Sequence, residues 1–427
     1  MSNNGHRTIK TADIIFREDL YPRIKQDPAL VQRYAQNLEV LPPIEVNQNN
    51  ELIDGWHRWT GHKTAEVDEI AVTVTVTKSD VELLALACLR NAAHGLQLSD
   101  KDKSKMAIRL YNLGTGLTKE RIAEVLSVTQ RSVTGYLTDI DDQLRKERKE
   151  KIEAMWLRCY ETQEIADEVK LDIRTVELEI AEIRKNGSFS DISLFGNFEP
   201  ELYSIWNFGK ATNDVKHPGN IPPEICDNVL YYYTKPGDVV FDPFGGGGST
   251  LDRCEERKRR CYISDLNPIP ARGTNIRQHD ITKGLPANLP VPDLVFLDPP
   301  YWQQAKHKYS KDETDLGNVE LESFLATIGN IARDVKRKWS KSSNTVGYLS
   351  LIIGPWKEDG EKIDLALLCY ERVSKYLPLA ERIIVPYSTE VHGGAYVAKA
   401  KEAKQILYLH RDLMVFKWNQ SKNQNDS

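Results

Sequence analysis

Pro236-Gly-Asp-Val-Val-Phe-Asp-Pro-Phe-Gly-Gly-Gly-Gly-Ser-Thr250 is the stretch that decides the fold of the second half of this chain. Its apolar run at 238–241 predicts a short buried strand, and the glycines after it predict a tight turn. A helix over about residues 249–258 and a second strand over 260–264, which leads into Asp265, are expected to follow. The order strand, glycine turn, helix, strand is typical of a doubly wound α/β sheet.

The glycine turn also predicts a binding site for a nucleoside. Glycines let the backbone approach a ligand closely, and an acidic side chain at the next strand end, here Asp265, can bind both ribose hydroxyls. Dinucleotide sites favour Gly-x-Gly-x-x-Gly, whereas here Phe244-x-Gly246-x-Gly248 follows Asp242. S-adenosylmethionine has no phosphate, but it carries an ammonium and a sulfonium group that the Asp242 carboxylate can face. Taken alone, the loop leaves a dinucleotide site and a purely structural turn as alternatives.

A second motif lies downstream, where Pro292-Asp-Leu-Val-Phe-Leu-Asp-Pro-Pro-Tyr-Trp302 places an apolar strand before Asp298. Ligands of such sheets bind beyond the carboxyl ends of the strands, so Asp298 is expected beside the glycine loop. Pro299 and Pro300 fix the backbone and lack N–H donors, which leaves carbonyl acceptors. The Asp298 carboxylate and the Pro299 carbonyl can hold both hydrogens of an aromatic amine, and Tyr301 can stack on the ring. The motif therefore suits direct in-line methyl transfer, while a plain strand-end turn is the alternative.

Residues 214–302 resemble the amino-methyltransferases that modify adenine N6 or cytosine N4 in DNA. The resemblance implies a Rossmann-like domain, S-adenosyl-L-methionine as the cofactor, and a base flipped out of the duplex as the substrate. It implies that Asp298, Pro299, Pro300 and Tyr301 form the catalytic tetrad, whose acidic first residue favours adenine over cytosine. The implied cofactor-binding residues are His217, Pro218, Asp242, Phe244, Gly246, Gly248, Ser249, Thr250, Asp265 and Asp280.

The chain departs from one common arrangement of this family. Members whose sequence before the glycine loop is similar to residues 217–224 of this chain often carry the tetrad upstream of that loop. In this chain the tetrad follows the loop. The resemblance therefore does not place the segment that recognises the target sequence.

The first hundred residues mix short strands with helices. Strands are predicted at 44–46 and 70–76, and a helix over 80–98. Asp54-Gly-Trp-His-Arg58 resembles the Gly-Glu-Arg-Arg box of ParB-like partition proteins, and the similarity covers about residues 8–140. Trp56 and His57 replace the glutamate and the first arginine of that box, so nucleotide hydrolysis is not carried over. Arg58, at an expected helix N-terminus, is a candidate for binding a nucleotide or phosphate, and a turn with solvated charges is the alternative.

A helix-turn-helix is predicted over residues 117–137. Its apolar positions match two short helices at a turn, and Gln130, Arg131, Ser132 and Thr134 face outward on the second helix, which enters the major groove in such motifs. A weaker copy is predicted over 160–184. Because its outer face is more acidic, a purely structural helix pair explains it equally well.

Length and composition set the broad class. A chain of 427 residues predicts several domains: a ParB-like α+β domain at 8–98, an all-helical helix-turn-helix region at 99–186, a linker at 187–199, the α/β domain at 200–418, and a disordered tail at 419–427. The six cysteines show no Cys-x-x-Cys spacing, so no metal site is expected. No run is long and apolar enough for a membrane, and the polar start lacks a secretory signal, so a cytoplasmic protein of bacterial or phage origin is expected.

The sequence thus predicts a site-specific methyltransferase that acts on double-stranded DNA. The net charge of −5 gives no whole-chain support for nucleic-acid binding, which must rest on local basic clusters. The alternative is a ParB-like partition protein or transcription regulator with an inactive methyltransferase-like half. A third reading is methylation of RNA or of a small aromatic amine. A homodimer, and a restriction endonuclease partner in a restriction-modification system, stay open.

Overall fold

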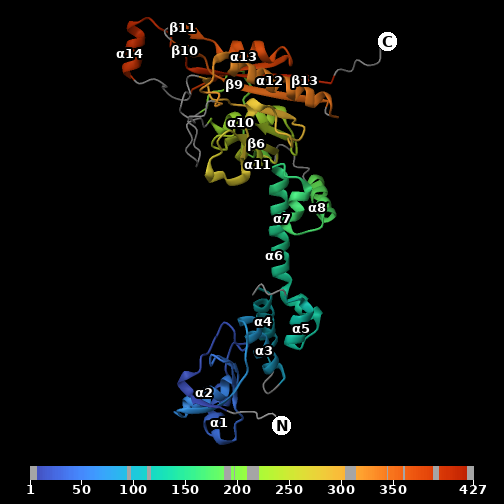
Figure 1. Ribbon diagram of the computed structural model, residues 1–427, viewed down its shortest axis with the longest axis vertical. Helices are drawn as coiled ribbons and strands as arrows, with labels where there is room; N and C mark the ends of the chain where they lie inside the picture. The colour runs from blue at the N-terminus through green and yellow to red at the C-terminus, as the bar shows by residue number, and fades with distance from the viewer. Residues whose placement is uncertain are drawn as a thin grey trace, which may run out of the picture. The chain divides into compact units, whose positions relative to one another are not determined.

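The structure is a computed structural model, and it describes residues 7–93, 98–112, 117–186, 194–196, 198–208, 221–302, 314–343, 345–358, 361–387 and 394–420. The chain divides into two compact units, Met1–Glu147 and Arg148–Ser427. Helix α6 (Gln130–Leu157) contributes residues to both units (Figure 1). The division therefore falls inside α6, whereas the sequence predicts the main boundary at 187–199.

The first unit begins with a four-stranded sheet in the order β1-β4-β2-β3. β2 and β4 are parallel, and the other pairs are antiparallel. The buried side chains of Ile44, Val46, Ile70 and Val72 form its core with Trp59. The elements are β1 (Arg7–Lys10), η1 (Thr11–Asp13), α1 (Pro28–Ala35), η2 (Leu38–Val40), β2 (Ile44–Val46), β3 (Leu52–Asp54), α2 (Trp56–Thr64) and β4 (Glu69–Val74). The strands predicted at 44–46 and 70–76 are confirmed, the second with bounds shifted by one or two residues.

Helices complete the first unit: α3 (Asp80–Ala93), α4 (Asp100–Asn112), α5 (Lys119–Leu126) and the start of α6. A left-handed residue, Ser127, ends α5 with φ of 52°, and α6 begins at Gln130. Ile122, Leu126 and Val133 are fully buried between these helices. The two helices predicted at a turn over 117–137 are therefore present, but the second, α6, has 28 residues and is not the short helix that was predicted.

The second unit opens with another helix pair, α7 (Thr162–Val169) and α8 (Ile173–Asn186), at the place of the weaker predicted copy. The residues between α6 and α7 are joined to the sheet that follows. The Arg260 guanidinium lies 5.1 Å from the Trp156 ring, and that of Arg277 lies 5.1 Å from Tyr160 and 4.2 Å from Tyr262. These contacts explain why the unit starts within α6 rather than at residue 187.

A seven-stranded sheet in the order β12-β13-β9-β8-β5-β6-β7 forms the body of the second unit. All strands are parallel except β13, which runs antiparallel between β9 and β12. The strands are β5 (Val239–Asp242), β6 (Arg260–Asp265), β7 (Arg277–Gln278), β8 (Leu294–Leu297), β9 (Val346–Ile353), β12 (Leu379–Pro386) and β13 (His410–Asn419). The doubly wound α/β sheet predicted from the glycine loop is confirmed.

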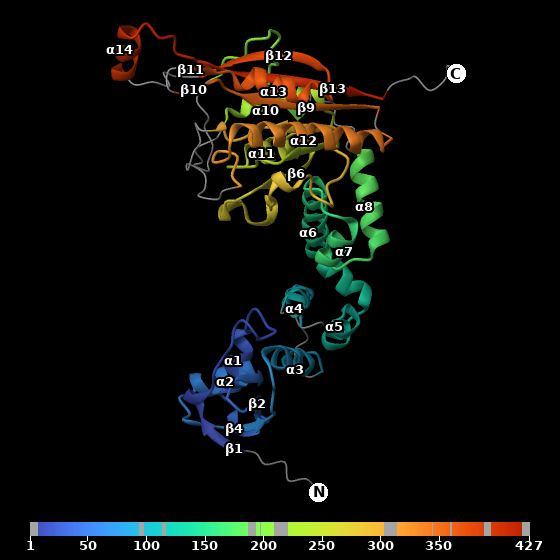
Figure 2. The same ribbon diagram turned by 45° about the horizontal axis from the view of Figure 1, so that its top comes forward.

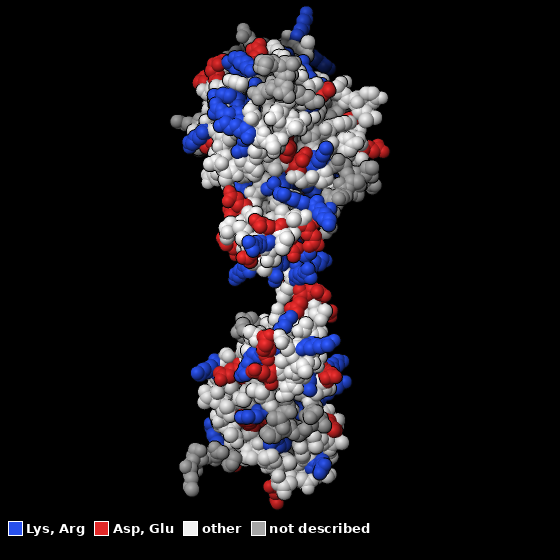
Figure 3. Space-filling model, turned by 90° about the vertical axis from the view of Figure 1, so that its right-hand side faces the viewer, with Lys and Arg blue, Asp and Glu red and all other residues white. Residues whose placement is uncertain are grey.

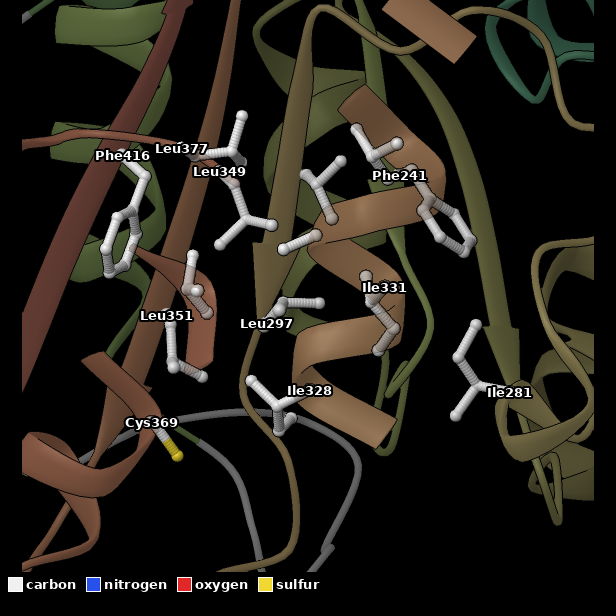
Figure 4. Close-up of a cluster of buried hydrophobic side chains, with 14 of the residues drawn as sticks. Phe241, Ile281, Leu297, Ile328, Ile331, Leu349, Leu351, Cys369, Leu377 and Phe416 are labelled. Atoms are coloured by element: carbon white, nitrogen blue, oxygen red, sulfur yellow. The ribbon is translucent and has the colours of Figure 1, made fainter. Parts of the chain in front are cut away.

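Helices cover both faces of this sheet. α10 (Pro223–Tyr233) and α11 (Ser249–Glu256) pack on one face, and α12 (Leu321–Ser340) and α13 (Leu365–Val373) pack on the other (Figure 2). Successive strand residues point to opposite faces, so Phe241 and Leu351 belong to the α12 side, whereas Val240 and Ile352 belong to the α10 side. Figure 4 shows the α12 side, where Ile328 and other helix residues meet the strands. The remaining elements are η3 (Pro270–Asn275), η4 (Ile281–Lys283), β10 (Trp356–Glu358), β11 (Glu361–Ile363) and α14 (Gly394–Glu402).

One central strand was not expected from the sequence. The apolar run within residues 381–386 predicts the last core strand, but β13 follows it and inserts between β9 and β12. Its buried run Leu413 to Phe416 explains why it lies inside the sheet. The polar residues His410, Arg411 and Asp412 at its start obscure this pattern in the sequence.

Candidate active site

Three acidic side chains lie where parallel strands end. Asp242 is the last residue of β5, Asp265 is the last of β6, and Asp298 follows β8. β5 pairs with β6 on one side and with β8 on the other, so the chain reverses its winding direction at β5. Ligands of open α/β sheets bind at such a switch point, beyond the carboxyl ends of the strands. We call this edge, with Asp242, Asp265 and Asp298, the site edge.

The glycine loop is held against the end of β6 by its own backbone. Gly246 N donates to the Asp265 carboxylate at 2.9 Å, and Gly245 N donates to the Ser264 carbonyl at 2.8 Å. A Cβ on Gly245 would lie 2.6 Å from Ile263 Cγ2, and Gly248 has φ of +89° where α11 begins. These positions need glycine because of a close approach in one case and a left-handed backbone in the other.

Asp242 is a buried carboxyl group with no Lys or Arg partner among the described residues. Burial raises its pKa to about 7, although hydrogen bonds from Thr250 and from Phe244 N oppose this rise. The nearby carboxyl groups of Asp298 and Asp265 raise it further. A cation arriving at this place would favour the ionised form, so Asp242 is suited to a positively charged ligand.

Asp298 and Tyr301 interact directly. Burial raises the pKa of Asp298 to about 7, while the positive charge of Arg411 and a hydrogen bond with Tyr301 oppose the rise. Burial beside Asp298 also keeps Tyr301 protonated, because it raises the tyrosine pKa well above its usual value. The Pro300 carbonyl accepts a 2.7 Å hydrogen bond from Trp302 N, which fixes the turn after the tetrad. Two members of the predicted tetrad, Asp298 and Tyr301, thus interact at the site edge.

The other residues predicted to hold a cofactor have different surroundings. Thr250 is buried beside Asp242, and the side chain of Asp280 caps η4 by accepting from Thr282 N at 3.0 Å. Partial burial raises the pKa of Asp280, but hydrogen bonds from Thr282 and Lys283 outweigh this effect and lower the pKa below its usual value. Phe244 and Ser249 lie in or directly after the glycine loop and are half-buried. His217 and Pro218 lie outside the described residues.

The predicted DNA-reading residues gather at the beginning of α6. Gln130, Arg131 and Thr134 are exposed, whereas Ser132 is half-buried and its hydroxyl lies 2.9 Å from that of Thr129. The Gln130 amide donates to Glu120 on α5. Arg131 carries an exposed positive charge near the N-terminus of α6. In a groove-binding helix-turn-helix, this end of the second helix faces the DNA.

Arg58 does not present an open guanidinium. It donates to Asp54 at 2.7 Å and to the carbonyls of Pro42 and Pro43 at 3.0 and 2.8 Å. The neighbouring positions are also used within the fold, because Trp56 stacks on Phe16 at 4.7 Å and His57 Nε2 accepts from Asp27 N at 2.9 Å. In the structure, residues 54–58 span the turn between β3 and α2, and their side chains make contacts within the fold.

Two residues at the site edge, Tyr387 and Arg411, were not predicted from the sequence. Arg411 lies at the start of β13, and Tyr387 follows β12. A Cβ on Gly354, directly after β9, would lie 3.0 Å from the Tyr387 hydroxyl and 3.6 Å from both Arg411 Cγ and Tyr301 Cε2. These side chains converge because β13 brings its first residues to the carboxyl end of the parallel strands. Since β13 itself was missed, nothing in the sequence analysis indicated them.

Comparison with known proteins gives the family context of this geometry. A family model described as "DNA methylase", for N6 and N4 enzymes, matches residues 97–270. The chain resembles the DNA methylases. The resemblance predicted from the sequence is thereby confirmed, and the matched range includes Asp242 and Asp265 but ends before Asp298.

Two curated proteins match over a short range. Type II methyltransferase M.XycI of Xanthomonas campestris pv. cyanopsidis is 34% identical over 65 residues, which is 15% of this chain and 22% of the relative. Type II methyltransferase M.Cfr9I of Citrobacter freundii is 32% identical over 65 residues, with the same coverage of 15% and 22%. The matches thus span about a fifth of the relatives' own length.

Solved structures match only distantly. The chromosome-partitioning protein ParB of Caulobacter crescentus complexed to the centromeric parS site is 16% identical, with 42% of this chain and 99% of that chain covered and a TM-score of 0.25. Precorrin-6y C5,15-methyltransferase of Geobacter metallireducens GS-15 is 15% identical, with 48% and 93% covered and a TM-score of 0.30. At these TM-scores neither structure informs the fold of this chain.

The described surface carries charges of both signs. Figure 3 shows Lys and Arg side chains gathered in patches among acidic ones on the face in view, in both units. Within the described part of the chain, no group of three or more His, Cys, Asp or Glu side chains could hold a metal ion. No described helix is long and apolar enough to cross a membrane.

Proposed function

We propose that this protein is a DNA methyltransferase that transfers a methyl group from S-adenosyl-L-methionine to an exocyclic amine of a flipped base. Adenine N6 is favoured over cytosine N4 because the tetrad begins with an acidic residue. One observation carries the proposal: Asp242 and Asp298 end the adjacent parallel strands β5 and β8 at the switch point, and Asp298 is hydrogen-bonded to Tyr301. On this proposal, the Asp242 carboxylate would bind the cationic cofactor and the Asp298 carboxylate would bind the amine, both at the site edge.

The residues at the site edge fit this cofactor. Asp265 lies beside the glycine loop, where a ribose would meet the strand end, and the close approach of Gly245 to Ile263 keeps the loop backbone near it. Asp242 offers a buried negative charge to an ammonium or sulfonium group. When bound, S-adenosyl-L-methionine supplies an electrophilic methyl group. Phe244, Gly246, Gly248, Ser249, Thr250 and Asp280 are proposed to line the same site, and His217 and Pro218 to close it.

The tetrad would prepare the amine for attack. The nitrogen lone pair of an aromatic amine is delocalised into the ring, so it is a weak nucleophile. Acceptance of both N–H hydrogens by Asp298 and the Pro299 carbonyl would favour the pyramidal form, in which the lone pair is available. Pro300 fixes the turn through the hydrogen bond from Trp302 N, and Tyr301, beside Asp298, would stack on the base. Holding the amine in line with the methyl group supplies much of the acceleration.

Double-stranded DNA is the proposed substrate because the chain combines this site with a helix-turn-helix. Gln130, Arg131, Ser132 and Thr134 at the start of α6 are proposed to contact the major groove. Extrusion of the base costs a few kcal/mol, which stacking and hydrogen bonds at its edge offset. A ParB-like role for residues 8–98 is a further part of this proposal. Since the curated relatives are named type II methyltransferases, a restriction-modification role is included.

The proposal is tested by sequencing, with detection of modified bases, DNA from cells that express the chain. We expect one modified motif with the wild-type protein and with the surface variant Asp167→Ala, and none with Asp298→Ala. Purified protein, labelled S-adenosyl-L-methionine and a duplex with that motif would then identify the methylated base. Sequence-specific DNA binding without any modification would instead support a partition or regulatory protein with an inactive catalytic half.

A further inference from the structure

Arg411 occupies an unusual place at the site edge. It is the second residue of β13, opposite Val385 on β12, and its neighbour Asp412 pairs with Ile353 on β9. Because β13 is antiparallel to both strands, its beginning lies at their carboxyl ends, on the same edge as Asp298. Only 6% of the Arg411 surface is exposed. A buried arginine here is costly unless its charge has a partner.

The contacts of Arg411 lead to the tetrad. Its guanidinium forms a hydrogen bond with Tyr301 and lies 4.9 Å from the centre of the Tyr387 ring. Its aliphatic part passes Gly354, where a Cβ would lie 3.6 Å from both Arg411 Cγ and Tyr301 Cε2. The Arg411 side chain therefore lies between the ends of β9 and β12 and contacts Tyr301.

Its charge faces Asp298. Burial opposes ionisation of Asp298, and Arg411 is the cation that acts against this effect. The other ionisable groups that interact with Asp298 among the described residues are Tyr301 after β8, Tyr387 after β12, Asp242 at the end of β5 and Cys226 on α10, and none of these is cationic. Among the described residues, Arg411 is thus the cation that favours a negative charge on Asp298, and the hydrogen bond with Tyr301 acts in the same direction.

Arg259, directly before β6, is a buried arginine with a purely structural role, and its hydrogen bonding differs from that of Arg411. Arg259 is fully buried, and its nitrogens donate to the Thr234 hydroxyl, the Thr234 carbonyl and the Arg257 carbonyl. In contrast, Nε of Arg411 is buried and has no hydrogen-bond partner within the described part of the chain. A buried donor left unpaired requires an explanation, and a place in a functional site is a common one.

We propose that Arg411 is a positioning residue of this site: it holds Tyr301 in place and favours the ionised form of the Asp298 carboxylate, which accepts the hydrogens of the amine. This inference rests on the proposed function, and it adds a residue from a strand outside both motifs. Arg411 acts through Asp298 and Tyr301, and its own contact with the base is not required.

The test measures the ionisation of Asp298 in the full-length protein, without relying on activity. The infrared C=O band of the protonated carboxyl group, assigned by its loss in Asp298→Asn, is followed against pH. We expect a midpoint near pH 7 in the wild type and a midpoint higher by about one unit or more in Arg411→Met. The matched control is Arg382→Met, on the neighbouring strand, because Arg382 pairs with Asp412 and is largely exposed.

A second variant separates charge from positioning. Arg411→Lys keeps the charge, so the midpoint should stay near that of the wild type, while kcat falls at least about tenfold with an unchanged KM for S-adenosyl-L-methionine, since Tyr301 is no longer held. Thermal unfolding identifies a variant that has not folded, and Arg411→Lys then decides if Arg411→Met fails. An unmoved midpoint in folded Arg411→Met, or full kcat in Arg411→Lys, would overturn the inference. A wild type that methylates no DNA would instead remove the proposed function, and the infrared result would still decide whether Arg411 favours the ionised form of Asp298.

Discussion

At the scale of single residues, we expect Asp242 to link the proposed cofactor binding to pH. Its pKa is raised to about 7 by burial, and a cationic ligand needs the ionised form. Below that pH the carboxyl group must lose a proton when the ligand binds. Each further decrease of one pH unit therefore lowers the affinity about tenfold. We therefore expect the affinity for S-adenosyl-L-methionine, measured by calorimetry, to rise as the pH increases from about 6 to about 8.

The Asp242→Asn variant serves as the control for this pH dependence. It cannot ionise, so its affinity should be independent of pH across the same range and weaker by about tenfold to hundredfold at high pH, as expected for a lost charge-assisted contact. A variant with the same pH slope as the wild type would show that another group carries the effect.

The same carboxyl groups give the ligand-free protein an opposite dependence of stability on pH. Asp242 and Asp298 have folded-state pKa values of about 7, above the ordinary value of 3.8. The folded state therefore binds more protons than the unfolded state between these values, and the free energy of unfolding should fall as the pH rises from about 4 to about 7. Asp238, with a pKa raised to about 6, contributes with the same sign. Urea denaturation should show a flatter profile in the double variant Asp242→Asn, Asp298→Asn, and an unchanged slope would contradict this account.

At the scale of elements, the glycine loop and helix α6 each contain a glycine, and the two glycines differ in the space around them. A Cβ at Gly245 would lie 2.6 Å from Ile263 Cγ2, so Gly245→Ala must displace the loop or strand β6. We expect a loss of about 1–3 kcal/mol in the free energy of unfolding, together with weaker cofactor binding. Gly135, in the exposed part of α6, has nothing within 4 Å of its would-be Cβ. Gly135→Ala should therefore raise stability by about 0.5–1 kcal/mol, and equal effects of the two changes would contradict this reading.

The elements also show what could be predicted from the sequence. Strands β5, β6 and β8 were predicted because short apolar runs precede the glycine loop, Asp265 and the tetrad. The helix-turn-helix was predicted because its apolar spacing is local. These signals need only neighbouring residues. Strand β13 was missed since its place between β9 and β12 depends on pairing across long stretches of chain.

The site divides in the same way. Asp242 and Asp298 each end a recognisable strand, so the doubly wound pattern places them on one edge without coordinates. Arg411 and Tyr387 meet Tyr301 only because β13 enters antiparallel and β12 ends beside it. The Arg58 position was predicted as a phosphate site from its box, but its hydrogen bonds to Asp54 and Pro43 become visible only in the fold.

At the scale of the whole molecule, recognition and chemistry are proposed to lie in different units. The start of α6 belongs to the first unit, and the site edge belongs to the second. With a net charge of −5, the proposed binding of DNA would depend on local contacts such as Arg131 rather than on the overall field of the chain. Loss of one unit should therefore affect binding and loss of the other should affect catalysis.

The variants Arg131→Ala and Asp298→Ala test this separation. Removal of one phosphate or base contact should weaken DNA binding by about 1–3 kcal/mol, and a phosphate contact would also lower the salt slope by about one. Arg131→Ala should thus lower kcat/KM for duplex DNA while kcat at saturating DNA stays near wild type, because no group at the site edge has changed. Asp298→Ala should bind the same duplex normally in an anisotropy titration over several salt concentrations and transfer no methyl group. If Arg131→Ala lowered kcat as strongly as kcat/KM, recognition by α6 would have to be part of the assembly of the catalytic site itself.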